Sequence, residues 1–179
     1  MPKLLTRTNL EMLSALAEQE YSLRELAERL KCSPAKIHQA AKIFKRHGLI
    51  LTERRRNRLF LKPDRKSPLY QRIKALINIS RITGSKTYLI LRKTGRIGVY
   101  GSYAAGTDEK ESDVDLLIVT EKKELALRKM IRALEEELEK KVNILVLTKE
   151  QLASLEKTDR EFSVRLRLTT ISLNGEIFG

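Results

Sequence analysis

Two aspartates stand one residue apart at the start of an unbroken apolar run, and this pattern most constrains how the chain can fold. Asp113 and Asp115 open the run Leu116–Val119, which predicts a buried strand. Residues two apart in a strand point to the same face, so the two carboxylates project side by side. Charge at the start of a buried strand is unfavourable without a partner. The pattern therefore predicts a site for divalent cations, because Mg²⁺ prefers carboxylate and phosphate oxygens.

A segment of small residues precedes the aspartates. Gly101, Ser102 and Gly106 belong to the pattern G-S-x-A-x-G, a turn suited to cradling phosphates. Together, G-S-x-A-x-G and the following S-D-x-D-L resemble the nucleotidyltransferase signature of the DNA polymerase beta superfamily, in its minimal nucleotidyltransferase branch. The resemblance covers about the second half of the chain.

This resemblance implies metal-assisted nucleotidyl transfer, in which two Mg²⁺ ions clamp a nucleoside triphosphate and the attacking hydroxyl. It assigns phosphate binding to Ser102 with nearby backbone N–H groups, and metal binding to Asp113 and Asp115. A third carboxylate is expected on the strand after the next helix, where this chain has Asn143. An amide is neutral and cannot act as a general base. Losing one electrostatic stabiliser costs about 3–4 kcal/mol of transition-state energy, so nucleotide binding can survive while turnover fails.

Other positions near the signature also depart from the family pattern. Ala105 stands where many relatives carry a basic residue, and the acidic loop 107–111 does not help to attract a triphosphate. Glu137 and Glu139 are close to Asn143 in sequence, but they lie at the expected end of a helix, so neither is an obvious substitute for the third carboxylate. Whether the domain is an active enzyme stays open on the sequence.

Charge is divided unevenly along the chain. The 179 residues carry a net charge of +13 at pH 7. Residues 1–95 hold 22 basic and 7 acidic side chains, whereas residues 96–179 hold 14 and 16. The excess in the first half predicts a polyanionic partner, with a solvated basic face as the alternative. Two halves with such different charge indicate two functional modules.

Helix start signals recur in the first half. Thr8–Glu11 and Ser22–Glu25 each match a capping box. Ser33 and Pro34 are typical of the N-cap and first position of a third helix, and Gly48 is typical of its end. Apolar residues at helical spacing follow each start signal, which predicts three helices with one buried face each.

Two strand-like runs follow the third helix, Leu49–Glu53 and Arg58–Leu61, on either side of Arg54–Asn57. This order resembles the winged helix-turn-helix family over about residues 5–65. The resemblance implies that the third helix enters the major groove of double-stranded DNA and that the hairpin contacts phosphates or the minor groove. The predicted DNA-contacting residues are Lys36, His38, Gln39, Lys42, Arg54, Arg55, Arg56 and Arg58.

A connecting helix and an alternation of strands and helices complete the chain. Ser67 and Pro68 predict the start of the connecting helix, with apolar positions at Leu69, Ile73, Leu76 and Ile77. The predicted strands beyond it are Thr87–Leu91, Ile97–Tyr100, Asp113–Thr120, Val142–Leu147 and a short one within Ile171–Phe178. The predicted helices are Glu121–Lys140, with Leu125 among its apolar positions, and Lys149–Leu168.

The sequence thus predicts an α+β protein. Its expected domains are an N-terminal winged helix-turn-helix over residues 1–66, a connecting helix over 67–84, and a nucleotidyltransferase-like α/β domain with a mixed sheet over 85–179. A homodimer through the connecting helix is a further hypothesis. The single cysteine, Cys32, excludes an internal disulfide and fits a reducing cytoplasm. No apolar run reaches the roughly 18 residues needed to span a membrane.

Three hypotheses for function follow. The leading one is a DNA-binding transcriptional regulator whose C-terminal domain binds a Mg²⁺-nucleotide with weak or absent catalysis. The second is an active nucleotidyltransferase that moves a nucleoside monophosphate onto a protein, nucleic acid or small molecule, with the basic domain recruiting the acceptor. The third is an antitoxin-like or other partner-binding module.

Overall fold

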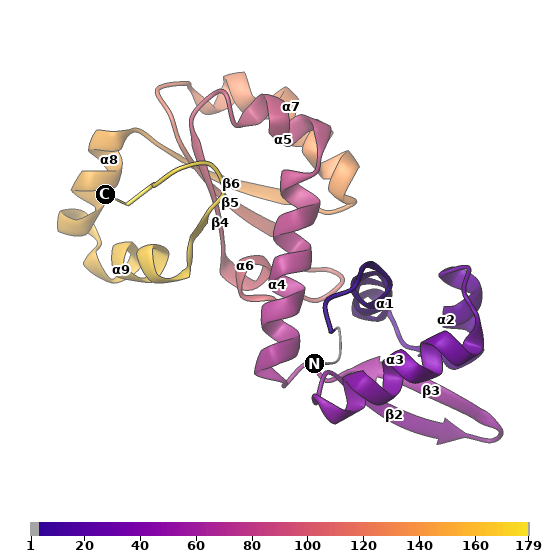
Figure 1. Cartoon of the computed structure of the whole chain (residues 1–179). Helices are drawn as coiled ribbons and strands as arrows, with labels where there is room; N and C mark the ends of the chain where they lie inside the picture. The colour runs from indigo at the N-terminus through magenta and orange to yellow at the C-terminus, as the bar shows by residue number, and fades with distance from the viewer. Residues whose placement is uncertain (1–3, 179) are drawn as a thin grey trace. The chain divides into compact units, whose positions relative to one another are not determined.

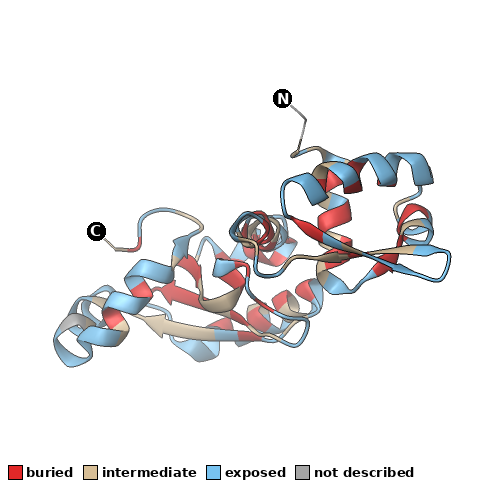
Figure 2. Cartoon of the chain, turned by 90° about the horizontal axis from the view of Figure 1, so that it is seen from below, coloured by how far each residue is buried: buried red, intermediate tan, exposed pale blue. Residues whose placement is uncertain are grey.

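A computed structural model describes residues 4–178 of the chain. The chain divides into two compact units, residues 1–77 and 78–179, and each has its own hydrophobic core. Figure 1 traces both units and labels their elements, and Figure 2 shows the buried residues inside each of them. No helix within residues 4–178 is long and apolar enough to cross a membrane.

In its described part, the first unit has three helices, the first part of a fourth helix (Pro68–Thr83) and a small antiparallel sheet in the strand order β1-β3-β2. Its hydrophobic core includes the fully buried Met12, Leu16 and Phe44. The helix-turn-helix order followed by a hairpin agrees with the sequence prediction. In chain order the elements are α1 (Arg7–Glu18), β1 (Tyr21–Ser22), α2 (Leu23–Arg29), α3 (Pro34–Arg46), β2 (Ile50–Arg55) and β3 (Arg58–Pro63).

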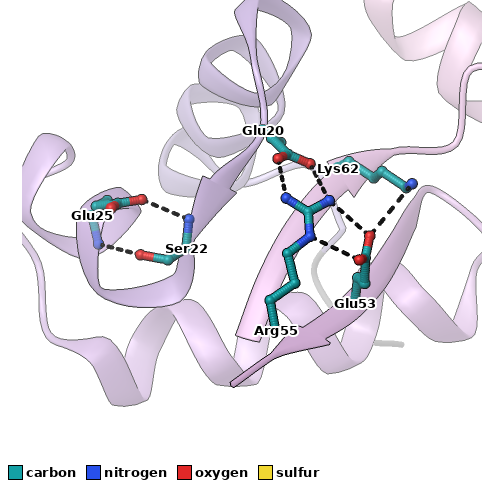
Figure 3. Close-up of polar contacts among 6 residues, drawn as sticks. All are labelled: Glu20, Ser22, Glu25, Glu53, Arg55 and Lys62. Carbon is teal, nitrogen blue, oxygen red and sulfur yellow. Dashed lines mark hydrogen bonds and ion pairs between the residues drawn. The ribbon is translucent and has the colours of Figure 1, made fainter. Parts of the chain in front are cut away.

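Two of the predicted helix starts are confirmed. The Ser22 hydroxyl accepts from the N–H of Glu25 at 3.4 Å, and the Glu25 carboxylate accepts from the N–H of Ser22 at 2.9 Å, so α2 begins with a complete capping box (Figure 3). At α3, the Ser33 hydroxyl accepts from the N–H of Lys36 at 3.3 Å, and Pro34 takes the first helical position.

The predicted capping box at Thr8 is wrong. Helix α1 begins at Arg7, and its N-cap is Thr6, whose hydroxyl accepts from the N–H of Asn9 at 3.3 Å. The Glu11 carboxylate does not reach back to a cap, because it pairs with the Arg7 guanidinium one turn earlier at 2.8 Å. This i, i+4 ion pair requires Arg7 to lie inside the helix.

The hairpin is longer than the sequence indicated, and a third strand joins it. Its strands reach Arg55 and Pro63, so only Arg56 and Asn57 form the turn, with Arg56 at φ +52°. The two residues of β1 pair with β3, Tyr21 opposite Leu61. A strand of two residues is too short to produce a recognisable alternation of apolar and polar positions.

Helix α4 (Pro68–Thr83) starts where predicted, since the Ser67 hydroxyl accepts from the N–H of Tyr70 at 3.3 Å. Its buried positions differ from the predicted stripe. Tyr70 and Ile73 lie in the first core, whereas Leu69 and Leu76 are exposed. Two polar residues of α4, Lys74 and Asn78, are buried instead, and apolar periodicity alone gave no sign of them.

The second unit is built on a mixed sheet in the order β6-β5-β4-β7 within the described residues. Strands β5 and β6 are parallel, and the other pairs are antiparallel. The predicted α+β class with a mixed C-terminal sheet is therefore confirmed. In chain order the elements are α5 (Lys86–Leu91), β4 (Arg96–Tyr100), α6 (Gly101–Ala105), β5 (Val114–Val119), α7 (Glu124–Leu138), β6 (Val142–Leu147), α8 (Lys149–Thr158), α9 (Arg160–Thr169) and β7 (Ile171–Ser172).

Strand β5 is buried on both faces. Leu116 and Ile118 belong to the cluster that includes residues of α5 and α7, and Leu117 and Val119 belong to the cluster that includes residues of α8 and α9. This explains why its sequence is continuously apolar rather than alternating. The site aspartates lie at the N-terminal end of this buried strand.

The predicted strand Thr87–Leu91 is wrong, because the segment forms helix α5. Ser85 is its N-cap. The Glu137 carboxylate, from α7, accepts hydrogen bonds from the N–H groups of Lys86 at 2.8 Å and Thr87 at 3.0 Å. These are N–H groups that a helix start leaves without an intrahelical partner. A residue about 50 positions away therefore helps to select helix over strand.

Two other predicted elements need correction. The helix predicted from residue 121 begins at Glu124, so Leu125 lies in its first turn, 72% exposed rather than buried. The single helix predicted over 149–168 is two helices, α8 and α9. They meet at Asp159, whose carboxylate accepts from the N–H of Phe162 at 3.0 Å and caps the second helix.

Candidate functional site

The two aspartates and Asn143 lie together at one edge of the mixed sheet. Parallel pairing of β5 with β6 places Asp115 directly opposite Asn143. The side-chain amide of Asn143 donates to Oδ2 of Asp113 and to Oδ1 of Asp115, both at 3.2 Å. Sequence reasoning predicted all three residues for one site, and the fold brings them together.

The Asn143 amide bridges two carboxylates of like charge. Its N–H groups are donors, so they lower the cost of holding Asp113 and Asp115 side by side. The donor set fits Mg²⁺, because both carboxylates supply oxygen ligands. Within residues 4–178, no group of three or more His, Cys, Asp and Glu side chains could hold a metal ion. The cluster therefore offers two charged ligands rather than three.

The two glutamates near Asn143 in sequence have other positions. The Glu137 carboxylate binds the start of α5, where the Thr87 hydroxyl and two N–H groups lower the pKa of this carboxyl. Glu139 ends α7 in the left-handed conformation, at φ +53°, and is exposed. Neither glutamate donates to or accepts from the Asp113–Asp115–Asn143 cluster in any hydrogen bond of the described residues.

The small-residue segment before the aspartates is a short helix rather than a simple turn. It forms α6, which ends at Gly106 in the left-handed conformation, and the Ser102 carbonyl accepts from the N–H of Thr107 at 3.0 Å. Gly101 has φ +69°, and a Cβ atom there would lie 2.5 Å from Oδ2 of Asp115. Gly101 thus lets the backbone approach a site carboxylate, which only glycine allows.

Tyr100 is a neighbour of the site that sequence reasoning did not single out. It pairs opposite Asp115 in the antiparallel register of β4 and β5. Burial, with a smaller contribution from the Asp115 charge, raises the pKa of the Tyr100 hydroxyl. The hydroxyl therefore stays protonated at neutral pH and remains a hydrogen-bond donor.

The predicted DNA-contacting residues of α3 share its exposed face. Ile37, Ala40, Ala41 and Phe44 are buried on the opposite face, so the helix is amphipathic as predicted. Exposed residues on α3 are Ala35, Lys36, His38, Gln39, Lys42, Lys45 and Arg46. This face is rich in cations and hydrogen-bonding groups, as expected of a surface that contacts a polyanion.

The wing arginines are all exposed, but they differ in their partners. Arg58 lies 3.8 Å from a Glu25 carboxylate oxygen, and its side chain is 70% exposed. Among the described residues, Arg54 and Arg56 take part in no ion pair. Their guanidinium groups are thus available to phosphates.

Arg55 takes part in a network of ion pairs on the protein surface (Figure 3). Its guanidinium donates to Glu53 at 2.7 and 2.8 Å and also to both oxygens of Glu20. It lies 4.8 Å from the centroid of the Phe60 ring, and Lys62 lies 3.9 Å from Glu53 on the other side. Four hydrogen bonds leave few donors for DNA, so the predicted DNA contact of Arg55 has a competitor within the unit.

Comparisons with known proteins found a family match in each half of the chain. Residues 85–166 match the nucleotidyltransferase domain family, and residues 4–65 match a family named HVO_A0114. The adhesin competence repressor AdcR from Streptococcus pyogenes is a similar solved structure, with 18% identity, a TM-score of 0.42, and coverage of 52% of this chain and 71% of that chain. ZitR from Lactococcus lactis is another, with 23% identity, a TM-score of 0.40, and coverage of 75% of each chain.

None of the curated proteins matches this sequence. The family match covers the strands and helices that carry Gly101, Asp113, Asp115 and Asn143. The preceding unit has the order of three helices and a two-stranded wing that its sequence predicted. The chain therefore joins an N-terminal unit of winged helix-turn-helix fold to a C-terminal unit that matches the nucleotidyltransferase domain family.

Proposed function

We propose that the protein is a DNA-binding transcriptional regulator of the cytoplasm, and that its nucleotidyltransferase domain binds a Mg²⁺-nucleotide with weak or absent catalysis. The observation that carries the proposal is the Asn143 amide, which bonds to both Asp113 and Asp115 at the position that the family resemblance assigns to a third carboxylate. The site thus has two carboxylates, Asp113 and Asp115, as ligands for a cation, and it has a neutral amide in place of the third carboxylate.

The first part of the proposal, nucleotide binding (the nucleotide arm), is supported by the chemistry of the side chains and backbone groups at the site. Asp113 and Asp115 would hold Mg²⁺, which would supply positive charge for the phosphates of a nucleotide. Ser102 and the backbone N–H groups of α6 supply donors for phosphate oxygens. An amide accepts no proton at neutral pH, so Asn143 cannot serve as general base for an attacking hydroxyl.

The DNA arm rests on the exposed cationic face of α3 and on the two wing arginines available to phosphates. Lys36, Lys42, Arg54 and Arg56 can neutralise phosphates, which supplies sequence-independent affinity. Gln39 is exposed on α3, and its side-chain amide is of the type that bonds an adenine edge in the major groove. The net charge of +15 over residues 1–95, from 22 basic and 7 acidic side chains, favours association with a polyanion.

Calorimetric titration tests the nucleotide arm without knowledge of any acceptor. Mg²⁺-ATP and Mg²⁺-GTP are titrated into the wild type and into the double variant Asp113→Asn/Asp115→Asn. We expect binding of at least one nucleotide to the wild type and none to the double variant. If neither nucleotide binds to the wild type, the nucleotide-binding part of the proposal is contradicted. The proposed function would then depend on the DNA-binding unit alone.

An active nucleotidyltransferase is the second candidate, favoured by the family match and by the intact Gly101, Asp113 and Asp115 part of the site. Pyrophosphate release from ATP and GTP separates the two candidates. We expect a low rate in the wild type and a higher rate in Asn143→Asp. A substantial wild-type rate that Asn143→Asp does not increase supports the active enzyme instead.

A further inference from the structure

The loop between α6 and β5, residues 106–113, leads directly into the candidate cation site and is held by side chains from distant elements. Ser112 closes its turn, because its hydroxyl accepts from the N–H of Glu109 at 2.8 Å and its own N–H donates to the Glu109 carbonyl at 3.1 Å. Asn78, which is buried, donates to Oδ1 of Asp108 at 2.8 Å. These hydrogen bonds therefore fix the conformation of the loop.

Lys140 makes the densest set of contacts to this loop. Its ammonium group donates to three main-chain carbonyls, those of Glu109 at 3.1 Å, Lys110 at 2.8 Å and Ser112 at 2.9 Å. An ammonium group has three N–H donors, so each one has a partner. Exposed lysines usually leave these donors to water, whereas this one is only partly exposed.

The turn between α7 and β6 brings Lys140 to this position. Glu139 ends α7 in the left-handed conformation at φ +53°, which reverses the chain immediately before Lys140. Three residues later, Asn143 faces the two aspartates. One turn thus supplies both the amide that bridges the aspartates and the ammonium that holds the loop before them.

The Ser112 carbonyl is the contact that matters for the site. It belongs to the peptide group that joins Ser112 to Asp113, and a planar peptide cannot turn at one end alone. A hydrogen bond from Lys140 to this carbonyl therefore restricts the orientation of the peptide plane, which contains the Cα atom that carries the Asp113 side chain. Bonds from a charged donor are stronger than those between neutral groups.

We propose that Lys140 is a positioning residue of the cation site, which fixes the Ser112–Asp113 peptide so that Asp113 and Asp115 can share one divalent cation with a nucleotide. The proposal rests on the nucleotide arm of the proposed function. Lys140 acts through Asp113, and its role is to set the affinity for the metal-nucleotide rather than to take part in chemistry.

Lys141 provides a matched control. It adjoins Lys140 in the same turn and is exposed, and no hydrogen bond or ion pair of its side chain occurs among the described residues. Its carbonyl accepts from the N–H of Val114 at 2.9 Å, and a side-chain substitution leaves that bond in place. Lys140→Met and Lys141→Met each remove one positive charge at nearly the same place, so only the carbonyl contacts distinguish them.

The experiment is calorimetric titration of Mg²⁺-ATP into the full-length wild type, Lys140→Met, Lys141→Met and Lys140→Arg, with the melting temperature of each recorded. We expect Lys140→Met to raise the Kd at least tenfold, Lys141→Met to change it less than twofold, and Lys140→Arg to recover most of the affinity. A residue with a merely structural role would lower the melting temperature and leave the Kd of the folded protein unchanged.

The outcomes separate this inference from the proposed function. Equal losses in Lys140→Met and Lys141→Met, or no loss in either, overturn the role of Lys140 and leave the nucleotide site standing. Absence of binding to the wild type overturns the nucleotide site, and the role of Lys140 falls with it. If Lys140→Met does not fold, Lys140→Gln against Lys141→Gln gives the same comparison with a neutral donor in place.

Discussion

At the scale of single residues, Gly101 is held by two independent constraints. It has φ +69°, and an added Cβ would lie 2.5 Å from a carboxylate oxygen of Asp115. We predict that Gly101→Ala costs about 1–2 kcal/mol of unfolding free energy through backbone strain. It also weakens Mg²⁺-nucleotide binding at least tenfold, because Asp115 must move. Urea unfolding and calorimetry measure the two effects.

Gly175 is the control for this prediction. It has φ +92°, and no atom lies within 4 Å of its added Cβ. Gly175→Ala therefore imposes similar backbone strain without displacing a site carboxylate. We expect it to lose stability while keeping nucleotide affinity. A comparable loss of affinity in both variants would mean that general loosening of the unit, and not contact with Asp115, explains the effect.

Neighbouring wing arginines should differ in their roles. Arg55 gives its donors to Glu20 and Glu53, whereas Arg56 has no ion pair among the described residues. We predict that Arg56→Ala weakens DNA binding about three- to tenfold and leaves the melting temperature unchanged. Arg55→Ala should lower the melting temperature and affect DNA binding less. Fluorescence anisotropy with a labelled duplex and thermal denaturation measure these effects, and a larger DNA effect at Arg55 would contradict the assignment.

At the scale of elements, the start of α5 depends on the charge of Glu137. The Thr87 hydroxyl, followed by the N–H groups of Thr87 and Lys86, lowers the pKa of this carboxyl below its ordinary value of 4.5. A carboxyl with a lowered pKa in the folded state contributes stability above its ordinary pKa and loses it as pH falls through the lowered value. Acid should therefore destabilise the α5–α7 contact.

Unfolding by urea at a series of pH values from 7 to 3 tests this dependence. We predict that Glu137→Gln lowers stability at pH 7 and flattens the decline in stability below the ordinary pKa of 4.5. Glu136→Gln is the control, since Glu136 is an exposed neighbour on the same helix. If both variants follow the wild-type curve, the Glu137 cap contributes nothing measurable.

At the scale of the whole molecule, the uneven charge predicts a strong salt dependence of DNA binding. The logarithm of the binding constant falls with the logarithm of salt concentration, by about 0.9 for each phosphate neutralised. We predict that the α3 variant Lys36→Ala/Lys42→Ala reduces this slope by about one for each phosphate that the variant no longer neutralises. The matched variant Lys149→Ala/Lys157→Ala removes two charges from α8 and should leave the slope unchanged. Equal slopes in the wild type and both double variants would exclude α3 from the DNA interface.

Features that depend on neighbours along the chain could be predicted from the sequence. The capping box of Ser22 and Glu25 and the start of α3 at Ser33 involve residues three positions apart, so a local pattern specifies them. The position of Asp113 and Asp115 at the start of strand β5 follows from the local pattern of charged and apolar residues. The same holds for the amphipathic face of α3 and for the order of elements that gave the fold class.

Features whose partners are distant in sequence could not be predicted and are visible only in the folded protein. Thr87–Leu91 is helical although its residues favour a strand, and beside its local N-cap Ser85 the helix start is bound by the Glu137 carboxylate of another helix. Arg55 is engaged by Glu20, 35 positions away. The Ser112 carbonyl is held by Lys140, 28 positions away. In each case the stabilising hydrogen bond or ion pair joins residues that meet only after the chain has folded, so no local sequence pattern could predict it.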